Sequence, residues 1–265
     1  MAISQRTFRI LQQKSGPILK GLFESKLLNS VVPERLIVAL YDVYKGLEAV
    51  PMEEISRFVL HGTVAFDVGA HFGYYTTRFS SMVGERGKVI AIEPNDYSRQ
   101  ILERNLARRR ICNVRVFPCA AWSVSTELEL KIDGPLGVTS NIKRHAQSGG
   151  SMVQCRTIDE IVVELGNVRV GFIKVDVEGS EVDVLLGAKQ TLIDHRPVVL
   201  CEIGSDYGID GASHLIELFE ILATTSYECC DVSNLSPFTQ DQLYDSLSSL
   251  RYLDVILRPY TQIAG

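Results

Sequence analysis

The spacing of apolar residues changes from helical to strand-like near residue 60. Before that point, apolar residues recur every three or four positions, as on one face of a helix: Phe8, Leu11, Leu19, Leu22, Phe23, Leu27, Leu36, Ile37, Leu40 and Tyr44. Prolines at positions 17, 33 and 51 interrupt this pattern, because proline cannot donate the backbone hydrogen bond that a helix needs. We therefore predict a helical N-terminal extension over residues 1–60.

Five short runs rich in β-branched residues follow, and segments with helical spacing separate them. The runs occupy residues 63–68, 88–93, 113–118, 170–177 and 197–203, with helical segments at 74–82, 96–110 and 212–223. Continuous apolar runs of this length are typical of parallel strands that are buried on both faces. The alternation predicts an α/β fold with a doubly wound, mostly parallel, Rossmann-like sheet. Closing strands near 227–232 and 252–257 complete a domain over residues 61–265.

The middle of this domain breaks the alternation. Residues 126–132 (TELELKI) alternate in the manner of an antiparallel strand, and a segment rich in glycine and serine follows from 134 to 151. Such a segment is typical of a surface loop. We predict an inserted hairpin with a mobile tip over about 124–156.

Composition limits the kind of protein this can be. The 265 residues are 46% hydrophobic and 22% charged, as in an ordinary globular protein. The net charge of -5 would repel a polyanion and lacks the basic excess that is typical of proteins that bind nucleic acid. No nucleic-acid partner is therefore expected. The six cysteines form no CxxC pair, and no run resembles a signal peptide or a bilayer span. We expect a cytoplasmic protein without an integral membrane segment.

The strongest local signal for a binding site is the segment from Asp67 to Tyr74, which ends the first strand and opens a helix. In an open α/β sheet, the ligand crevice lies outside the carboxyl ends of the strands. Gly69 and Gly73 allow close backbone approach, and the new helix offers free N–H groups. Glu93 ends the second strand, where an acid can accept both ribose hydroxyls of an adenosine.

This pattern fits both NAD and S-adenosylmethionine, and two features separate them. A dinucleotide fingerprint needs G-x-G-x-x-G for its pyrophosphate, whereas this turn reads G-A-H-F-G. Asp67 precedes the turn, and a carboxylate is unfavourable beside a diphosphate but favourable beside an ammonium group. The pattern therefore favours a cationic donor that carries no phosphate.

A longer set of motifs resembles one known family. The motifs are DVGAHFGYYT, AIEPN, Asn105, NVRVFPCAAW, TIDEI, IKVDVEGSE, VLLGA and VVLCEI, spread over about residues 60–205. Together they are similar to the FkbM-type methyltransferases. The resemblance implies a class I S-adenosylmethionine-dependent methyltransferase (EC 2.1.1.-). It also implies the usual reaction of this family, methylation of a hydroxyl on a small molecule, glycolipid or saccharide. The family commonly has Asn where this chain has His71, which can still donate a hydrogen bond near the donor's amino-acid part.

The donor-binding residues predicted from these motifs follow the first three strands and the fourth run. They are Asp67, Gly69, Ala70, His71, Gly73, Tyr74, Glu93, Pro94, Ala120 and Asp176.

The acceptor side is expected where the fourth run ends, next to the first strand. Methyl transfer to a hydroxyl requires loss of a proton, so Asp176, Glu178 or His145 is a candidate base. Glu181 is better explained as an acid in the first turn of a helix. The loop from about Pro135 to Gly150, with the helices before Pro51, is expected to act as a lid over the acceptor pocket.

Lys174 is a lysine inside a buried run, so it needs an acidic partner, and Glu202 at the end of the next run is the candidate. The acids Asp176, Glu178 and Glu202 are also oxygen ligands suited to Mg²⁺, but no spacing fixes their geometry, and we predict no metal site. The five histidines are scattered, which does not support zinc.

Two alternative functions remain open at this point. The first is an NAD-linked oxidoreductase, which the glycine spacing disfavours. The second is a catalytically inactive subunit that binds the donor and serves a partner. Asp67, Gly69, Gly73, Glu93 and Asp176 are all present, so the sequence does not indicate loss of activity.

Overall fold

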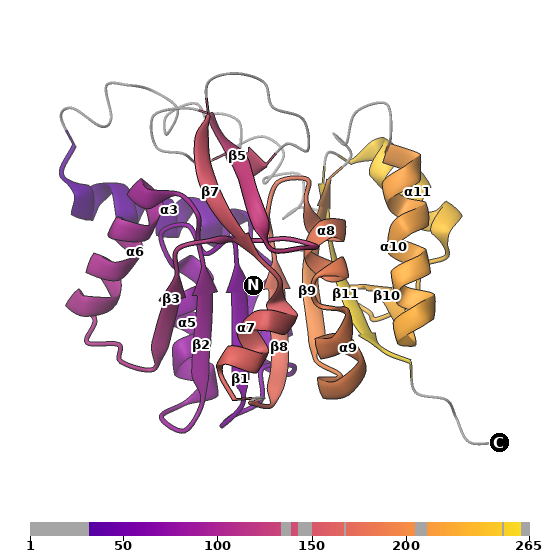
Figure 1. Cartoon of the computed structure of the whole chain (residues 1–265), viewed down its shortest axis with the longest axis horizontal. Coiled ribbons are helices and arrows are strands. Elements are labelled where there is room, and N and C mark those ends of the chain that lie inside the picture. The colour runs from indigo at the N-terminus through magenta and orange to yellow at the C-terminus, as the bar shows by residue number, and fades with distance from the viewer. Residues whose placement is uncertain are drawn as a thin grey trace, which may run out of the picture.

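A seven-stranded sheet forms the centre of the molecule, with the order β10-β11-β9-β8-β1-β2-β3 (Figure 1). The computed structural model describes residues 32–133, 139–142, 150–166, 168–204, 211–250 and 252–260. The strands are β1 (Val64–Val68), β2 (Lys88–Ile92), β3 (Val114–Phe117), β8 (Val170–Val175), β9 (Val198–Gly204), β10 (Tyr227–Asp231) and β11 (Tyr252–Pro259). Neighbouring strands are parallel except where β11 pairs antiparallel with β9 and with β10. The predicted fold class, a mostly parallel Rossmann-like sheet, is confirmed.

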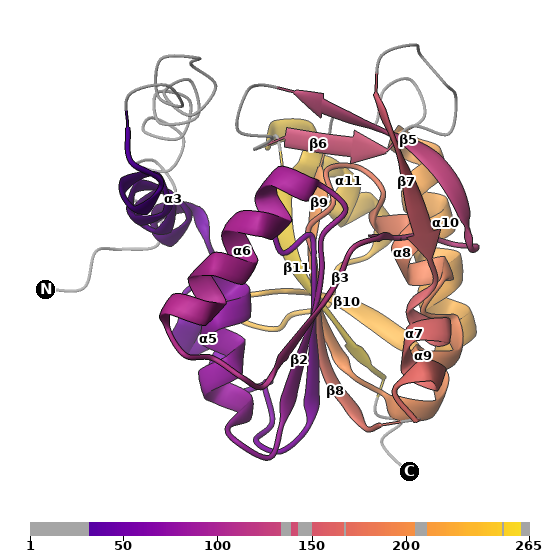
Figure 2. The ribbon, with the colours of Figure 1, turned by 60° about the vertical axis from the view of Figure 1, so that its left-hand side comes forward.

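Helices cover both faces of this sheet (Figure 2). On one side are α3 (Glu34–Glu48), α4 (Met52–Ser56), α5 (Tyr74–Val83) and α6 (Asp96–Arg108); on the other are α7 (Ile158–Glu164), α8 (Glu181–Leu186), α9 (Lys189–His195), α10 (Gly211–Thr225) and α11 (Gln240–Ser249). Alternate residues of β1 divide between two hydrophobic cores: Phe66 packs in the core shared with α7 to α11, and Ala65 in the core shared with α3 to α5. All five β1 residues are buried, which explains the unbroken apolar run.

The order of the strands reverses at β1. From β1 the chain runs outward through β2 to β3, and later returns to place β8 on the other side of β1. The carboxyl ends of β1, β2 and β8 therefore meet at one edge, where ligands bind in sheets of this kind.

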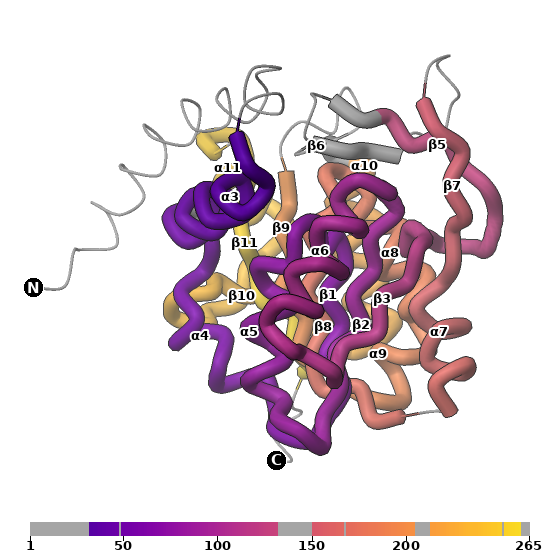
Figure 3. Tube along the Cα trace, turned by 90° about the vertical axis from the view of Figure 1, so that its left-hand side faces the viewer, coloured from indigo at the N-terminus to yellow at the C-terminus, as the bar shows by residue number. Residues whose placement is uncertain are grey.

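A second, smaller sheet contains the segment predicted as an inserted hairpin and is larger than that prediction. It contains β4 (Ala120–Ala121), β5 (Thr126–Asp133), β6 (Thr139–Ile142) and β7 (Ser151–Arg156), in the order β4-β7-β5-β6. β5 pairs antiparallel with both β6 and β7, and β7 pairs with β4. The strand β6 lies inside the segment predicted as loop. It was not predicted because its short sequence, TSNI, lacks the alternation that marks a strand. Figure 3 shows β7 at the end of the molecule where α3 also lies.

Two of the prolines that were predicted to interrupt the helical pattern stand directly before helices. α3 follows Pro33 and α4 follows Pro51, whereas Pro17 lies outside the described residues. Proline is favourable at a helix start because the first N–H groups have no partner within the helix.

The buried face of α3 matches the apolar pattern in part. Ile37 and Tyr44, which belong to the pattern, are buried against α4 and α5, whereas Leu36 and Leu40 are exposed. Tyr41, which the pattern omitted, is also buried and adds a large ring to this face. The described part of the N-terminal extension therefore shares the core of the sheet domain.

Ion pairs on the surface connect α3 to α6 and to Arg109, the residue directly after α6. Glu34 pairs with Arg104 at 2.8 Å and with Arg108 at 2.7 Å, and Asp42 pairs with Arg109 at 3.0 Å. Exposed pairs contribute only about 0 to 1 kcal/mol each, so the buried tyrosines carry most of the attachment. Together these contacts fix the position of α3 at the carboxyl edge of the sheet.

Among the described residues, no helix has both the length and the hydropathy that crossing a bilayer requires. Five of the six cysteines are buried, and Cys112 is exposed.

Two glycines with nearly the same φ provide a test of the packing between the turns that follow β1 and β8. Gly69 has φ +79° and Gly62 has φ +80°, but a Cβ on Gly69 would lie 1.9 Å from the carbonyl oxygen of Asp176, whereas a Cβ on Gly62 meets nothing within 4 Å. Gly62→Ala should cost about 1 kcal/mol, the strain of a left-handed conformation. Gly69→Ala should cost at least about 3 kcal/mol, because a strand must also move. Denaturant unfolding measures both, and equal losses would contradict this account of the junction.

Candidate active site

A cavity opens at the carboxyl edge of the sheet, and together with the open solvent at its mouth it encloses about 690 Å³. Its walls come from α3, the turn after β1, the end of β2, the strands β4 and β5, and the turn after β8. The lining residues are Tyr41, Lys45, Val68, Gly69, His71, Ile92, Glu93, Pro94, Ala120, Ala121, Leu130, Asp176, Val177, Glu178 and Ser180. The cavity thus lies at the point where the strand order reverses.

The turn after β1 is fixed by backbone contacts to its neighbours. The N–H groups of Gly69 and Ala70 donate to the carbonyl oxygen of Ile92 at 3.0 and 3.1 Å, which ties the turn to β2. The Asn105 side chain donates to the carbonyl of Phe72 at 3.3 Å. Gly73 then takes φ +89°, and α5 begins at the next residue. The turn is held rigidly enough to present its backbone to a ligand.

Glu93 ends β2 as a buried acid in the wall of the cavity. Its two carboxylate oxygens accept hydrogen bonds from the backbone N–H groups of His71 and Asn95, each at 2.8 Å. Burial raises the pKa of Glu93 to about 7, against the opposing effect of these two N–H groups. Each carboxylate oxygen has a second lone pair, so Glu93 can still accept hydroxyl groups.

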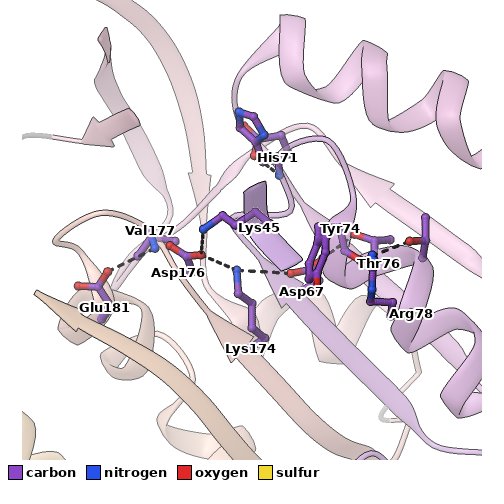
Figure 4. Close-up of polar contacts among 12 residues, drawn as sticks. Lys45, Asp67, His71, Tyr74, Thr76, Arg78, Lys174, Asp176, Val177 and Glu181 are labelled. Carbon is purple, nitrogen blue, oxygen red and sulfur yellow. Dashed lines mark hydrogen bonds and ion pairs between the residues drawn. The ribbon is translucent and has the colours of Figure 1, made fainter. Parts of the chain in front are cut away.

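A chain of alternating charges runs from beneath the turn into the cavity (Figure 4). Thr76 donates to Asp67 at 2.5 Å, and the ammonium of Lys174 lies 3.9 Å from the other oxygen of Asp67. The same ammonium lies 2.9 Å from Oδ2 of Asp176, and Lys45 of α3 reaches that oxygen at 3.4 Å. Two buried acids are thereby neutralised by two lysines, one from β8 and one from α3.

The partner predicted for Lys174 is wrong. In the register of the sheet, Lys174 lies opposite Asp67 on β1 and Leu200 on β9, so Glu202 lies two residues too far along its strand. Glu202 is paired in register with Asp254 of β11. Burial and the nearby carboxylates raise the pKa of Glu202 well above its usual range.

Asp176 and Lys45 are both charged at neutral pH. Burial alone would raise the pKa of Asp176, but the lysines at positions 174 and 45 hold it well below its usual range. Burial alone would lower the pKa of Lys45, but Asp176 and, to a smaller extent, Tyr41 raise it well above its usual range. A carboxylate with so low a pKa accepts a proton poorly, which weighs against a role of Asp176 as the base.

Most of the predicted site residues come together in the cavity. Those that line it are Gly69, His71, Glu93, Pro94, Ala120, Asp176 and Glu178. The other predicted donor-binding residues, Asp67, Ala70, Gly73 and Tyr74, are not among the lining residues and support the turn instead. His145 and most of the predicted lid from Pro135 to Gly150 lie outside the described residues.

Glu181 has the structural role expected of it. It lies in the first turn of α8, and its carboxylate accepts hydrogen bonds from the backbone N–H groups of Val177 and Gly179. These bonds shape the turn that presents Asp176 and Glu178 to the cavity.

Sequence reasoning missed the residues that α3 and β5 contribute, namely Tyr41, Lys45 and Leu130. The ring of Tyr41 lies 4.6 Å from that of His71, centroid to centroid. The available signal was that Lys45 follows Tyr41 by four positions, which places a cation on the buried face of the helix. A group of at least three potential metal ligands is not found among the described residues.

Comparison with known proteins identifies the family. The family model described as "Methyltransferase FkbM domain" matches residues 67–229, which include the turn after β1, Glu93 and Asp176. The chain belongs to the FkbM methyltransferase family. This assignment displaces the oxidoreductase alternative. No curated protein matches the chain in a search for relatives.

Several solved methyltransferases are similar to this FkbM family member at low identity. The FkbM methyltransferase of Methylobacillus flagellatus KT is 19% identical, with a TM-score of 0.48 over 83% of this chain and 53% of that one. This chain thus spans about half of that protein. Aeropyrum pernix fibrillarin, solved with natively bound S-adenosyl-L-methionine, is 14% identical (TM-score 0.42, 76% and 68% covered). An S-adenosylmethionine-dependent O-methyltransferase from Thermotoga maritima is 12% identical (TM-score 0.44, 84% and 73% covered).

If Glu93 binds the donor as the sequence predicts, its raised pKa should make donor binding dependent on pH. Since its pKa is about 7, lowering the pH from 8 to 6 protonates Glu93 and weakens it as a hydroxyl acceptor. We expect the dissociation constant of S-adenosylhomocysteine, measured by calorimetry, to rise about tenfold over this range. Glu93→Gln should weaken binding at pH 8 by about 1.5 to 3 kcal/mol and remove this part of the pH dependence. An unchanged affinity in Glu93→Gln would reduce Glu93 to a residue that only ends a strand.

Proposed function

We propose that this protein transfers a methyl group from S-adenosylmethionine to a hydroxyl on a small molecule, glycolipid or saccharide. The observation that carries this proposal is Glu93, a buried carboxylate at the end of β2, in the same cavity as the glycine turn after β1. This is the place and the chemistry that bind the ribose of an adenosine. Membership of the FkbM family supports methyl transfer as the reaction.

The charge of the cavity supports a cationic donor over a dinucleotide. Among the described residues that line it, the ionisable side chains of lysine and acid type are Lys45, Glu93, Asp176 and Glu178, one cation against three acids, of which Glu93 has a pKa of about 7. A diphosphate would be repelled by this set, whereas a sulfonium with an ammonium group would be attracted. S-adenosylmethionine is a cation of this type.

The residues present suit this donor. Glu93 would hold the ribose hydroxyls, the backbone at Gly69 would allow close approach, and Pro94 and Ala120 would contribute apolar surface beside the adenosine. The donor supplies an electrophilic methyl group on its sulfonium. The task left to the protein is to orient the acceptor oxygen, exclude water and remove the oxygen's proton.

Glu178 is our candidate for the residue that takes this proton. It lines the cavity in the turn after β8, two residues beyond Asp176, with a left-handed φ of +54°. A left-handed conformation is uncommon for a residue with a side chain, and such strain gathers at functional sites. Asp176, held ionised by two lysines, would keep the site negative beside a donor that carries positive charge.

The acceptor would enter between α3 and the small sheet, which both contribute to the walls. The net charge of -5 disfavours a polyanionic acceptor such as nucleic acid. The predicted lid, formed by the loop from Pro135 to Gly150 and the helices before Pro51, would choose among neutral hydroxyl compounds.

Donor identity can be tested without knowledge of the acceptor. S-adenosylmethionine and S-adenosylhomocysteine at 100 times their dissociation constants should stabilise the native state by about 2.7 kcal/mol, and NAD and NADP should not. For a chain of this size, the melting temperature should rise by about 5 to 10 °C. Stabilisation by NAD alone would overturn the assignment of the donor.

Catalysis can be tested with labelled donor and a cell extract. We expect mass spectrometry to identify a labelled small molecule, lipid or saccharide, methylated on oxygen. With that product as the readout, Glu178→Gln should lower the initial rate by about 10² to 10⁴ and leave the dissociation constant of S-adenosylhomocysteine within about twofold of wild type. A wild-type protein that binds donor but labels nothing would favour the inactive partner subunit.

A further inference from the structure

Lys45 brings a cation from α3 into the donor cavity, and methyl transfer as proposed gives it no task. Its ammonium lies 3.4 Å from Oδ2 of Asp176, and the two side chains are 20% and 11% exposed. A lysine held inside a cavity at a cost in desolvation requires a compensating partner. The question is whether Asp176 alone accounts for it.

Asp176 has a second cation beside it. Lys174 lies closer, at 2.9 Å, and is more deeply buried, with 5% of its side chain exposed. Lys174 also faces Asp67, at 3.9 Å, whereas Lys45 lines the cavity. Both ammonium groups contact Oδ2, and no described residue donates a hydrogen bond to Oδ1. The cavity therefore presents a second cation and an available carboxylate oxygen side by side.

This pair is complementary to the zwitterionic end of an α-amino acid, which carries a carboxylate and an ammonium on one carbon. We propose that Lys45 and Asp176 together hold the amino-acid end of S-adenosylmethionine: Lys45 binds its α-carboxylate, and Oδ1 of Asp176 accepts a hydrogen bond from its α-ammonium. The proposal rests on the proposed function, since it concerns the same donor.

The topology gives this arrangement a second anchor. Glu93 ends β2 and Asp176 follows β8, the two strands that flank β1, so the anchors lie on opposite sides of the turn that contains Gly69. The adenosine would be held at Glu93 and the amino-acid end at Lys45 and Asp176. The low pKa of Asp176 and the high pKa of Lys45 keep both groups charged for this purpose.

Binding would exchange one ion pair for two. The donor's carboxylate and ammonium would each meet a charge that is already buried and oriented, so little further desolvation or ordering of the protein is required. Because Lys45 belongs to α3, this contact would also make the N-terminal helix part of the donor site.

Calorimetry with the full chain tests the proposal by removing the interaction from either side. S-adenosylhomocysteine carries the amino-acid end, and 5′-methylthioadenosine shares its adenosine and thioether but lacks that end. Lys45→Met keeps the length of the side chain and removes its charge. We expect Lys45→Met to weaken S-adenosylhomocysteine by about 10- to 100-fold and to leave 5′-methylthioadenosine within about twofold. Lys45→Arg should keep most of the affinity for S-adenosylhomocysteine.

Two controls separate this effect from a loss of structure. Lys88→Met alters an exposed lysine at the opposite end of β2 and should change neither affinity. In the unaltered protein, decarboxylated S-adenosylmethionine should bind about 10- to 100-fold more weakly than S-adenosylmethionine, and Lys45→Met should abolish this difference.

An equal loss of affinity for both adenosine compounds in Lys45→Met would overturn the proposal, because it would indicate a structural role for Lys45. An unchanged affinity of Lys45→Met for S-adenosylhomocysteine would also overturn the proposal, but it would leave the proposed function intact. If the unaltered protein bound neither S-adenosylmethionine nor S-adenosylhomocysteine, the proposed function would fail, and this inference with it.

Discussion

The buried ammonium of Lys174, between the carboxylates of Asp67 and Asp176, is the interaction on which the geometry of this site depends. It joins β1 to β8 at the place where the strand order reverses. Removing one member of a buried ion pair typically costs about 3 to 5 kcal/mol, because the remaining charge is left without a partner. The network therefore fixes how the two turns that form the cavity face each other.

This network also separates the residues proposed to bind the donor from those that maintain the fold. Asp67 pairs with Lys174 and accepts a hydrogen bond from Thr76. It therefore supports the turn and is not among the residues that line the cavity. Asp176 lies at the other end of the network, where it lines the cavity. In the proposed function, its negative charge serves to recognise a cation, and Glu178 is the proposed proton acceptor.

Much of this architecture could be predicted from the sequence, because buried parallel strands and the helices between them leave strong periodic signals. The strand ends then located Gly69, Glu93 and Asp176 at one edge of the sheet, since parallel strands end together. The partner of Lys174 could not be predicted in the same way. It depends on the register between strands, which places Lys174 opposite Asp67.

The contribution of α3 was hidden for a different reason. Helical spacing marks Tyr41 and Lys45 as neighbours on one face, but not the part of the sheet that this face meets. The short strand β6 was missed because four mostly polar residues, TSNI, are stabilised by pairing with β5 rather than by a pattern of their own. Contacts between segments far apart in the sequence thus decided what local patterns could not.

A crystal structure of the full chain with S-adenosylhomocysteine would test the central claim of this account most directly. The account predicts the ribose hydroxyls against the carboxylate of Glu93, and the amino-acid end between Lys45 and Asp176, with Lys174 still bound to Asp176. Adenosine bound away from Glu93, or an amino-acid end that contacts neither Lys45 nor Asp176, would contradict it.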